Sequence, residues 1–440
     1  MNWTSLLSLK RYGDTNDRPR LLQDETRLGY EVDYDRIIFS DMFRSLQDKT
    51  QVVPLSDVDF VHTRLTHSLE VSVVGRSLGR IVGEALLSKY PELKQNGYKI
   101  NDFGAIVAAA ALAHDIGNPP FGHSGERAMG DYFANAQGRV FKNKLNPTQW
   151  QDLIAFEGNA NGFRLLTENR PGIKGGLRLS YATLGAFMKY PKLSTPVKPD
   201  RHIANKKYSV FYKDREFFDE LAGELGLLSQ EAHAAYFRHP LAYLVEAADD
   251  ICYSIIDFED GINLGLISED KALEYLLNLV RSNMITEKYT GLKTSKDRVS
   301  YLRALAIQSL IYEAADVFIK NEVQILNGRF PQALLDKCRY EAQLKDIIDI
   351  SINQMYMSKE VVEKELTGYN VLQDLLDVFI TAVNNTYAHK PTGFDKLVMK
   401  LLPEEHQRLS DDLYERLINV CSYIAGMSDR YAIQLHQKIK

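Results

Sequence analysis

Two histidines and two carboxylates occur within thirteen residues of one another, as His114, Asp115, His123 and Glu126. An apolar, Ala-rich run over residues 105–113 comes directly before them and predicts a helix that is buried on every side. A polar pair at the end of such a helix indicates a functional site rather than a solvated face, because a rigid mount holds side chains in one geometry.

The predicted helix ends just after this pair. Gly117 is a suitable C-cap, and Pro119 and Pro120 prevent the helix from continuing. The stiff loop then presents His123 and Glu126. Because these two residues lie about one helical turn apart, the carboxylate is in a position to orient the imidazole.

A second polar pair, Arg64 and His67, lies at the start of another predicted helix, which Thr63 or Thr66 can cap. The two side chains are three residues apart and share a face. A lone histidine at such a position is usually structural. However, the N-terminus of a helix attracts anions, and Arg64 beside it suits a phosphate.

A third helix is predicted from Pro240, at its first position, to about Phe258. Asp249, Tyr253 and Asp257 recur at every fourth residue and therefore stack on one face. Like charges on one face are unfavourable unless a metal or polar ligand lies against them. A solvated acidic stripe is the alternative.

One residue set from these three helices has the chemistry of a metal site, namely His67, His114, Asp115 and Asp249. Imidazole and carboxylate ligands suit one divalent ion, and the ligand types alone do not select among the candidates. We expect Mn²⁺ or Mg²⁺, with Fe²⁺, Ni²⁺ and Zn²⁺ as alternatives. His123 is close in sequence to the ligand pair but outside the set, which makes it a candidate for proton transfer.

Composition narrows the function class. The chain has 440 residues and a net charge of −5, so no global basic field attracts nucleic acid. Its three cysteines lie far apart and predict neither a disulfide framework nor a cysteine-based zinc site. The N-terminus lacks the apolar core of a signal peptide, and no run reaches transmembrane length. We expect a soluble cytoplasmic protein that does not bind membranes.

Secondary-structure patterns are almost entirely helical. Apolar residues recur with a period of 3.6 through most of residues 270–440, and the only strand candidate is weak, at residues 208–212. These patterns predict an all-α fold.

The order of the chemical residues, with His on one helix, His-Asp at the end of a second and Asp on a third, resembles the HD superfamily of metal-dependent phosphohydrolases. Six segments, in the same order along nearly the whole chain, are similar to the deoxyguanosinetriphosphate triphosphohydrolase family. They are RSLQDKTQV (44–52), HTRLTHS (62–68), HDIGNPPFGHSGE (114–126), FEGN (156–159), EAADDICY (246–253) and AGMSDRYA (425–432).

The resemblance implies an HD-domain helical core with an additional C-terminal helical region. Composition adds two further expectations: the charged residues 1–35 predict an irregular arm with little core of its own, and the Asn, Gly, Pro and Lys content of residues 137–215 predicts a loop-rich insertion. We therefore expect an N-terminal arm (1–35), an HD phosphohydrolase domain (36–270) with this insertion at about 137–215, and a C-terminal helical region (271–440). That last region would complete the site and the interface of a homo-oligomer, often a hexamer. The implied reaction splits a deoxynucleoside triphosphate (dNTP) into deoxynucleoside and inorganic triphosphate, which would control dNTP pools.

The resemblance also assigns roles by position. His67, His114, Asp115 and Asp249 would hold the metal, and His123, Glu126 and Asn118 would serve catalysis. Substrate contacts would come from Arg44, Gln47, Arg64, Lys207 of the Lys206-Lys207 pair, Tyr253, Asp257 and Arg430.

Two other function classes are compatible with parts of the sequence. Another HD phosphohydrolase, acting on cyclic nucleotides or hyperphosphorylated guanosine, would need a different sugar pocket or a second histidine cluster, and the remaining histidines are scattered. A non-catalytic nucleotide sensor or single-stranded DNA binder would not need the full set of chemical residues. A nucleotide or single-stranded DNA as a regulatory ligand stays open.

Overall fold

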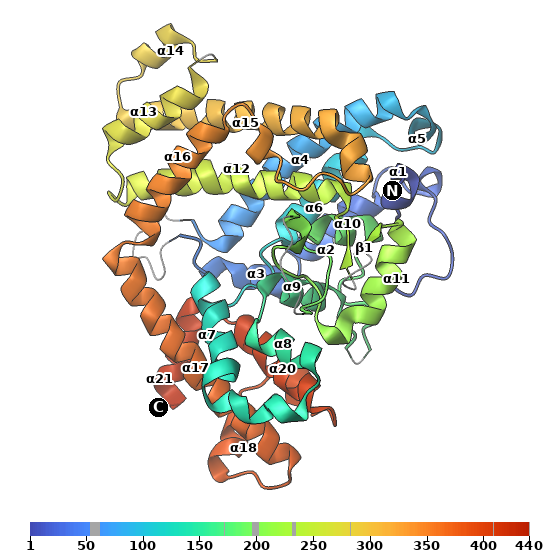
Figure 1. Ribbon diagram of the computed structural model, residues 1–440, viewed down its shortest axis with the longest axis vertical. Coiled ribbons are helices and arrows are strands. Elements are labelled where there is room, and N and C mark those ends of the chain that lie inside the picture. Colours follow the sequence, from blue (N-terminus) through green and yellow to red (C-terminus); the bar gives the residue numbers. More distant parts are fainter. Residues whose placement is uncertain are drawn as a thin grey trace.

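The computed structural model describes residues 1–52, 62–170, 172–195, 202–230, 235–281, 283–407 and 409–439. Helices build nearly all of it, which confirms the predicted all-α class (Figure 1). Within the described residues the one sheet is small, with β1 (Ser229–Gln230) antiparallel to β2 (Ala235–Tyr236). The weak strand candidate at 208–212 contributes only an isolated bridge, between Leu193 and Val210.

The elements of the first part of the chain are α1 (Trp3–Leu6), η1 (Arg20–Leu22), α2 (Gly29–Ile38), α3 (Asp41–Arg44), η2 (Ser45–Asp48), α4 (Arg64–Lys89), α5 (Pro91–Gln95), α6 (Ile100–Ala113), α7 (Gly122–Asn135), η3 (Gln137–Lys144), α8 (Pro147–Ile154) and α9 (Gly158–Thr167).

The middle of the chain contains α10 (Tyr181–Phe187), η4 (Ile203–Asn205), η5 (Tyr212–Asp214), α11 (Arg215–Leu225), α12 (Pro240–Asn263), α13 (Glu269–Val280), α14 (Thr286–Gly291) and α15 (Ser295–Leu326). The remaining elements are η6 (Leu335–Lys337), α16 (Glu341–Ser351), the π-helix η7 (Ile352–Tyr356), α17 (Lys359–Tyr387), α18 (Gly393–Met399), α19 (Glu404–Gln407), α20 (Leu413–Ala425) and α21 (Asp429–Ile439). No helix among the described residues is both long and apolar enough to cross a membrane.

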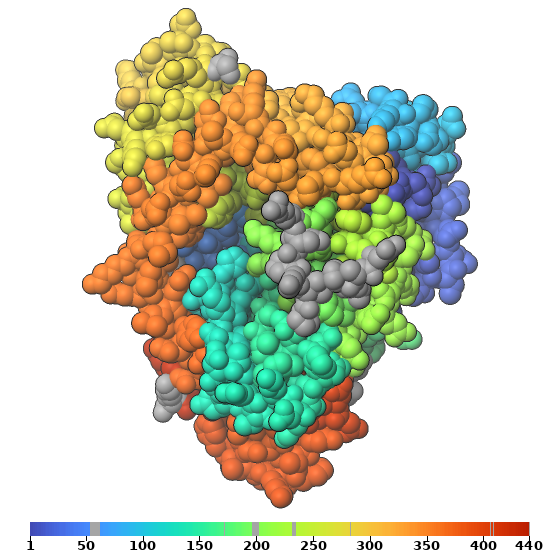
Figure 2. Space-filling view, in the orientation of Figure 1, coloured from blue at the N-terminus to red at the C-terminus, as the bar shows by residue number. Residues whose placement is uncertain are grey.

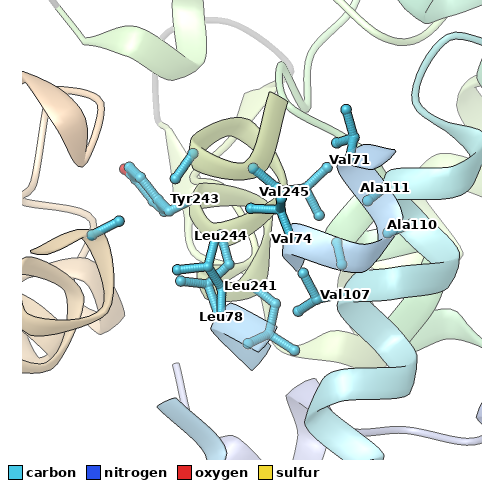
Figure 3. Packing of buried hydrophobic residues seen from close by; sticks show 14 of the residues in the cluster. Val71, Val74, Leu78, Val107, Ala110, Ala111, Leu241, Tyr243, Leu244 and Val245 are labelled. Atoms are coloured by element: carbon cyan, nitrogen blue, oxygen red, sulfur yellow. The ribbon is translucent and has the colours of Figure 1, made fainter. Parts of the chain in front are cut away.

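Three helices, α4, α6 and α12, form the centre of the fold, and their ends follow the predicted signals. Thr63 caps α4 through a capping box with Thr66, and Pro240 is the first residue of α12. Their apolar faces meet in one buried cluster (Figure 3). These helices therefore position the residues at their polar ends.

The helices α4 and α6 approach unusually closely because glycines line the contact. Gly75, Gly79 and Gly83 recur at every fourth residue of α4 and face α6. A Cβ atom added at Gly79 would lie 2.6 Å from the carbonyl oxygen of Phe103, well inside van der Waals contact. Close packing of this kind tolerates no added methyl group without movement of a backbone.

The N-terminal segment 1–35 differs from the predicted arm. Trp3, Leu6 and Tyr30 are fully or almost fully buried in the main cluster. The indole of Trp3 also donates a hydrogen bond of 2.8 Å to Glu322 of α15. The charged residues at 14–20 predicted an irregular arm with little core of its own, but the apolar residues on either side of them bury enough surface to anchor the segment.

Two hydrophobic clusters organise the described chain. The first core contains residues from α1, α2, α4, α6, α10–α13, α15 and α16, and the second core contains residues from α7, α8, α17, α18, α20 and α21. The division between the cores does not follow the expected boundary at residue 270, because α13, α15 and α16 belong to the first core. The expected domain division itself stays a prediction.

The expected loop-rich insertion at 137–215 is more ordered than its Asn, Gly and Pro content suggested. It contains the helical elements η3, α8, α9, α10, η4 and η5. Pro147 begins α8 behind an Asn146 cap, so residues that usually mark loops here mark helix starts.

The glycine contact between α4 and α6 predicts a stability difference between two identical substitutions. Gly79→Ala should lower the free energy of unfolding by about 1–3 kcal/mol, because the new methyl group overpacks the contact. The methyl group that Gly223→Ala adds on α11 meets nothing within 4 Å. This substitution should raise the free energy of unfolding by about 0.5–1 kcal/mol, because alanine has the higher helix propensity. Denaturant unfolding of both variants measures the difference. A Gly79→Ala protein at least as stable as Gly223→Ala would contradict the packing.

Candidate active site

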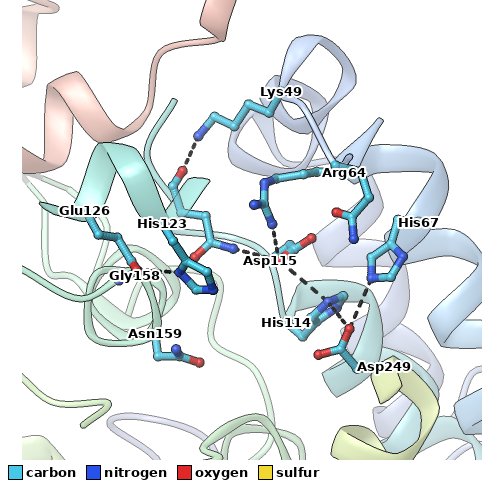
Figure 4. A network of polar contacts seen from close by, with 12 residues as sticks. Lys49, Arg64, His67, His114, Asp115, His123, Glu126, Gly158, Asn159 and Asp249 are labelled. Carbon is cyan, nitrogen blue, oxygen red and sulfur yellow. Dashed lines mark hydrogen bonds and ion pairs between the residues drawn. The ribbon is translucent and has the colours of Figure 1, made fainter. Parts of the chain in front are cut away.

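Three of the predicted metal ligands meet at one point of the first core. His67 lies on the first turn of α4, His114 directly follows α6, and Asp249 lies in the middle of α12. One ligand atom from each lies within 4.8 Å of the other two. The Oδ1 atom of Asp249 is 3.1 Å from Nε2 of His67 and 3.4 Å from Nε2 of His114 (Figure 4). This arrangement can hold a divalent metal ion.

The orientation of His114 supports this function. Its Nδ1 donates a hydrogen bond of 2.6 Å to the carbonyl oxygen of Ala111, one turn back in α6. That bond fixes the tautomer and leaves Nε2 as the atom that faces Asp249. The end of α6 therefore fixes both the position and the orientation of the His114 ring.

Asp115, predicted as the fourth ligand, lies beside this group but outside it. Its Oδ1 is 3.6 Å from Nε2 of His114 and accepts hydrogen bonds from Arg64 (2.7 Å) and Asn118 (2.6 Å). Within the described residues its buried Oδ2 has no hydrogen-bond partner. Burial raises the pKa of this carboxyl, but the charges of Arg64, His114 and His67 outweigh burial and bring the pKa below its ordinary value. A buried, ionised oxygen without a partner fits a metal ligand.

Lys189 is a site residue that sequence reasoning missed. Its ammonium group pairs with Asp249, and this pairing outweighs burial and holds the pKa of Asp249 well below its ordinary value. Lys189 follows α10 in the predicted insertion, and only folding brings it to the metal group. Nothing in the local sequence marked it.

His123 and Glu126 form the predicted pair on the first turn of α7. The Nδ1 atom of His123 lies 2.8 Å from Glu126, and the His123 side chain is 75% exposed. Burial raises the pKa of Glu126, but His123, Lys207 and the Gly158 amide lower it to about 2. The carboxylate therefore stays charged and holds the imidazole at neutral pH.

Lys207, rather than Lys206, is the lysine that reaches this pair. Its Nζ lies 3.1 Å from Glu157 and 3.6 Å from Glu126. Burial and the charge of Glu126 raise the pKa of Glu157 to about 7. Glu157 caps α9 and was not predicted as a site residue.

The metal group and the His123–Glu126 pair adjoin through Asn118 and Gly158. The Gly158 amide donates a hydrogen bond of 2.8 Å to Glu126. A Cβ atom on Gly158 would lie 2.1 Å from Oδ1 of Asn118, so only glycine fits between them. Because Asn118 also binds Asp115, the predicted metal and proton-transfer residues belong to one centre.

Tyr253 and Asp257 lie on α12 beyond Asp249, on the predicted face of the helix. Tyr356 and Gln51, which were not predicted, contact them. The ring of Tyr253 stacks on Tyr356, with centroids 5.8 Å apart and an interplanar angle of 2°. The hydroxyl of Tyr356 donates to Asp257 at 3.1 Å, and the side-chain amide of Gln51 donates at 3.5 Å. Burial, only partly offset by His67, raises the pKa of Asp257 to about 7.

Three predicted substrate contacts are exposed side chains. Arg44 and Gln47 line a separate cleft of about 980 Å³ between α3, η2 and the α20–α21 corner. None of His67, His114 and Asp249 lines that cleft. Arg430, at the start of α21, is also exposed. Gln51, four residues beyond Gln47 in the same sequence segment, is the glutamine that contacts Asp257.

Comparison with known proteins agrees with the site geometry. Residues 64–148 match the HD domain, and residues 337–438 match the phosphohydrolase-associated domain. A deoxyguanosinetriphosphate triphosphohydrolase-like protein of Synechocystis sp. is 41% identical over 100% of this chain and 99% of its own. A deoxyguanosinetriphosphate triphosphohydrolase-like protein of Pseudomonas aeruginosa is 37% identical over 100% of this chain and 98% of its own. A deoxyguanosinetriphosphate triphosphohydrolase of Yersinia pestis is 30% identical over 96% of each chain. Similarity of this extent, over a structure that gathers the HD residues at one centre, shows that the chain belongs to the deoxyguanosinetriphosphate triphosphohydrolase family.

Proposed function

We propose that this protein hydrolyses deoxynucleoside triphosphates to deoxynucleoside and inorganic triphosphate, with one divalent ion, Mn²⁺ or Mg²⁺, per site. The observation that carries the proposal is that the metal group and the His123–Glu126 pair are joined through Asn118 and Gly158. A His67–His114–Asp249 cluster adjoins an exposed imidazole, His123, that a charged carboxylate holds in place. In the space-filling view the surface is hollowed where α7 (teal), which carries His123, faces α16 and α17 (orange) (Figure 2).

Each part of the centre has a role in water attack on the α-phosphorus. His67, His114 and Asp249, with Asp115 beside them, would hold the divalent ion, which would supply Lewis acidity to phosphate oxygens. Arg64 and Lys207 provide positive charge for the triphosphate, and the N-terminus of α4 adds its dipole. His123 transfers a proton, and Glu126 keeps its ring oriented.

The face of α12 provides the sugar contacts in this proposal. Four residues of helix advance about 6 Å, roughly one phosphate-to-sugar step, from Asp249 to Tyr253 and again to Asp257. Tyr253 would pack against C2′ of the sugar, and Asp257 would accept a hydrogen bond from the 3′-hydroxyl. The Tyr356 hydroxyl, which now donates to Asp257, shows that this carboxyl accepts a hydroxyl donor.

The proposal includes a closed homo-oligomer, such as a hexamer, and a cytoplasmic location. Exposed apolar side chains on α15, including Tyr312, Ile319 and Val323, lie on one helical face and support a subunit contact. The location follows from the substrate class, because charged nucleotides do not cross membranes unaided. A nucleotide or single-stranded DNA regulator, and control of dNTP pools, belong to the same proposal.

Metal-dependent release of triphosphate is the first expected result. Purified protein should convert dGTP to deoxyguanosine and triphosphate with Mn²⁺ or Mg²⁺ and not with chelator. Asp249→Ala should lose both bound metal and turnover, because it removes the oxygen that both histidines face. Product chromatography and elemental analysis provide the measurements. The control is Asp250→Ala, the adjacent carboxylate of α12. Pyrophosphate as product, or full metal content in Asp249→Ala, would contradict the proposal.

His123 should matter for turnover and not for binding. His123→Ala should keep metal and nucleotide binding and lose about 10²–10⁴-fold in kcat, because it removes the proton-transfer group. His389→Ala, an exposed histidine after α17, is the control. Steady-state kinetics and nucleotide titration separate the two effects. Equal kcat values for the two variants at saturating substrate would rule out the proposed role.

Tyr253 should determine the preference for deoxyribose. Tyr253→Ala should raise hydrolysis of GTP relative to dGTP, because wild type leaves a 2′-hydroxyl buried without a partner at a cost of about 1–3 kcal/mol. Tyr356→Phe is the control, since it keeps the stacked ring and removes only the hydroxyl at Asp257. Parallel kcat/KM measurements on both nucleotides give the ratio. An unchanged ratio in Tyr253→Ala would place the discrimination elsewhere.

A further inference from the structure

The loop that joins the two halves of the catalytic centre contains a residue in an unfavourable conformation. This connecting loop, residues 114–121, runs from the metal ligand His114 to the start of α7. Its last residue, Phe121, has φ of +62° and ψ of 19°, in the left-handed region that side chains with a Cβ atom rarely adopt. Such a conformation persists only where surrounding contacts hold it.

A buried carboxylate from the other end of the chain holds this residue. Asp429, the first residue of α21, accepts a hydrogen bond of 3.0 Å from the backbone amide of Phe121 through Oδ1. Through Oδ2 it accepts a bond of 3.1 Å from the backbone amide of Thr50, together with one from the Thr50 hydroxyl. Asp429 is 1% exposed, so these bonds are shielded from water.

The Phe121 ring is held by the same C-terminal region. It packs directly against Gly368 of α17, where an added Cβ atom would lie 2.3 Å from the ring. The next helix, α7, packs along α17, and Phe121 belongs to the second core. Backbone and side chain of Phe121 are therefore both held by helices outside the HD-matched residues 64–148.

Lys49 connects the loop to the same corner of the molecule. Its ammonium group is buried and donates to the carbonyl oxygens of Asn118, in the connecting loop, at 2.7 Å and of Ala425, at the end of α20, at 2.6 Å. The α20–α21 corner is thus linked to the loop at two positions, directly at Phe121 through Asp429 and indirectly at Asn118 through Lys49.

The position of His123 depends on this loop more than on its own side-chain contacts. His123 follows Phe121 by two residues, and its ring is exposed, with Glu126 as its one hydrogen-bond partner among the described residues. The metal ligands belong to helices of the first core, whereas His123 is carried by α7 of the second core. A displacement of about 1 Å between reacting groups can cost about 10²-fold in rate.

We propose that Asp429 is a positioning residue for His123. By fixing Phe121 and Thr50, it sets the start of α7 relative to the metal ligands, and Gly368 gives the Phe121 ring the space that this placement requires. The C-terminal region is in this way part of the catalytic machinery without touching substrate. The inference rests on the proposed function only where turnover is the readout.

Two substitutions loosen the loop from different sides, and each has a matched control. Asp429→Ala removes all three hydrogen bonds that this carboxylate accepts from Phe121 and Thr50, and Gly368→Ala displaces the Phe121 ring. Asp395→Ala removes a buried carboxylate that binds Thr392 and Asn385 within the C-terminal region, and Gly393→Ala adds a methyl group that meets nothing within 4 Å. Amide hydrogen exchange over residues 116–126, bound metal, KM and kcat are measured for all four full-length proteins.

The expected result is faster exchange over residues 116–126 and a fall in kcat of about 10- to 100-fold in both loop variants, with KM and metal content near wild type. Asp429→Asn should restore part of the loss, because its side-chain oxygen still accepts from Phe121 while its amide cannot accept from Thr50. The control variants should keep wild-type exchange in this segment and wild-type kcat.

Loop exchange and kcat in Gly368→Ala and Asp429→Ala equal to those of their controls would overturn the proposal. If Asp429→Ala does not fold, Gly368→Ala decides alone, since its change is confined to the ring contact. A wild-type protein that hydrolyses no dNTP would refute the proposed function instead, and the exchange comparison would still decide whether Asp429 holds the loop.

Discussion

The close contact between α4 and α6 is the constraint on which the catalytic centre depends. His67 begins one of these helices and His114 follows the other, so the separation of the two imidazoles is set by how near the helix axes come. Gly79 lets the backbone of α4 approach the backbone of Phe103 and Gly104 in α6 directly, and Gly75 and Gly83 make room for the side chains of Val107 and Phe103. The third helix, α12, then packs on this pair and brings Asp249 to both imidazoles. A metal-binding geometry thus results from apolar packing several turns away.

Buried charge at this centre is balanced by contacts from distant segments. Asp249 pairs with Lys189, Asp115 with Arg64, and Glu126 and Glu157 share Lys207. An unpaired buried carboxylate is strongly unfavourable, so each cation allows an acid to remain inside the protein. The same cations place positive charge around the space where a triphosphate would bind. In the proposed function, the residues that compensate buried acids would also contribute to substrate affinity.

The division into two cores gives the phosphohydrolase-associated region a physical role. The candidate metal ligands lie on or next to helices of the first core, and His123 and Glu126 lie on α7, which belongs to the second core. The polypeptide crosses between the cores at the connecting loop, with its left-handed Phe121. Contacts from Lys49, Asp429 and Gly368 all converge on this crossing. Packing within each core does not determine how the cores meet, so the contacts at this crossing fix His123 and Glu126 relative to the metal group.

The sequence by itself determined the local features of this protein. Helical periodicity, the Thr63 cap, Pro240 at a helix start and the polar pair after an apolar run are all local, and the structure has each of them. The motif order marked His67, His114, Asp249, His123 and Glu126, because residue type and helix position restrict what such side chains can do. Only the tertiary structure decided which groups surround them. Lys189, Gln51 and Tyr356 contact the centre from segments far apart in the chain, and Asp429 contacts its connecting loop. Arg44 and Gln47 line a cleft to which none of His67, His114 and Asp249 contributes. The physical reason is that charge pairing, burial and the fit of the second core against the first depend on contacts between distant residues, which no local pattern records.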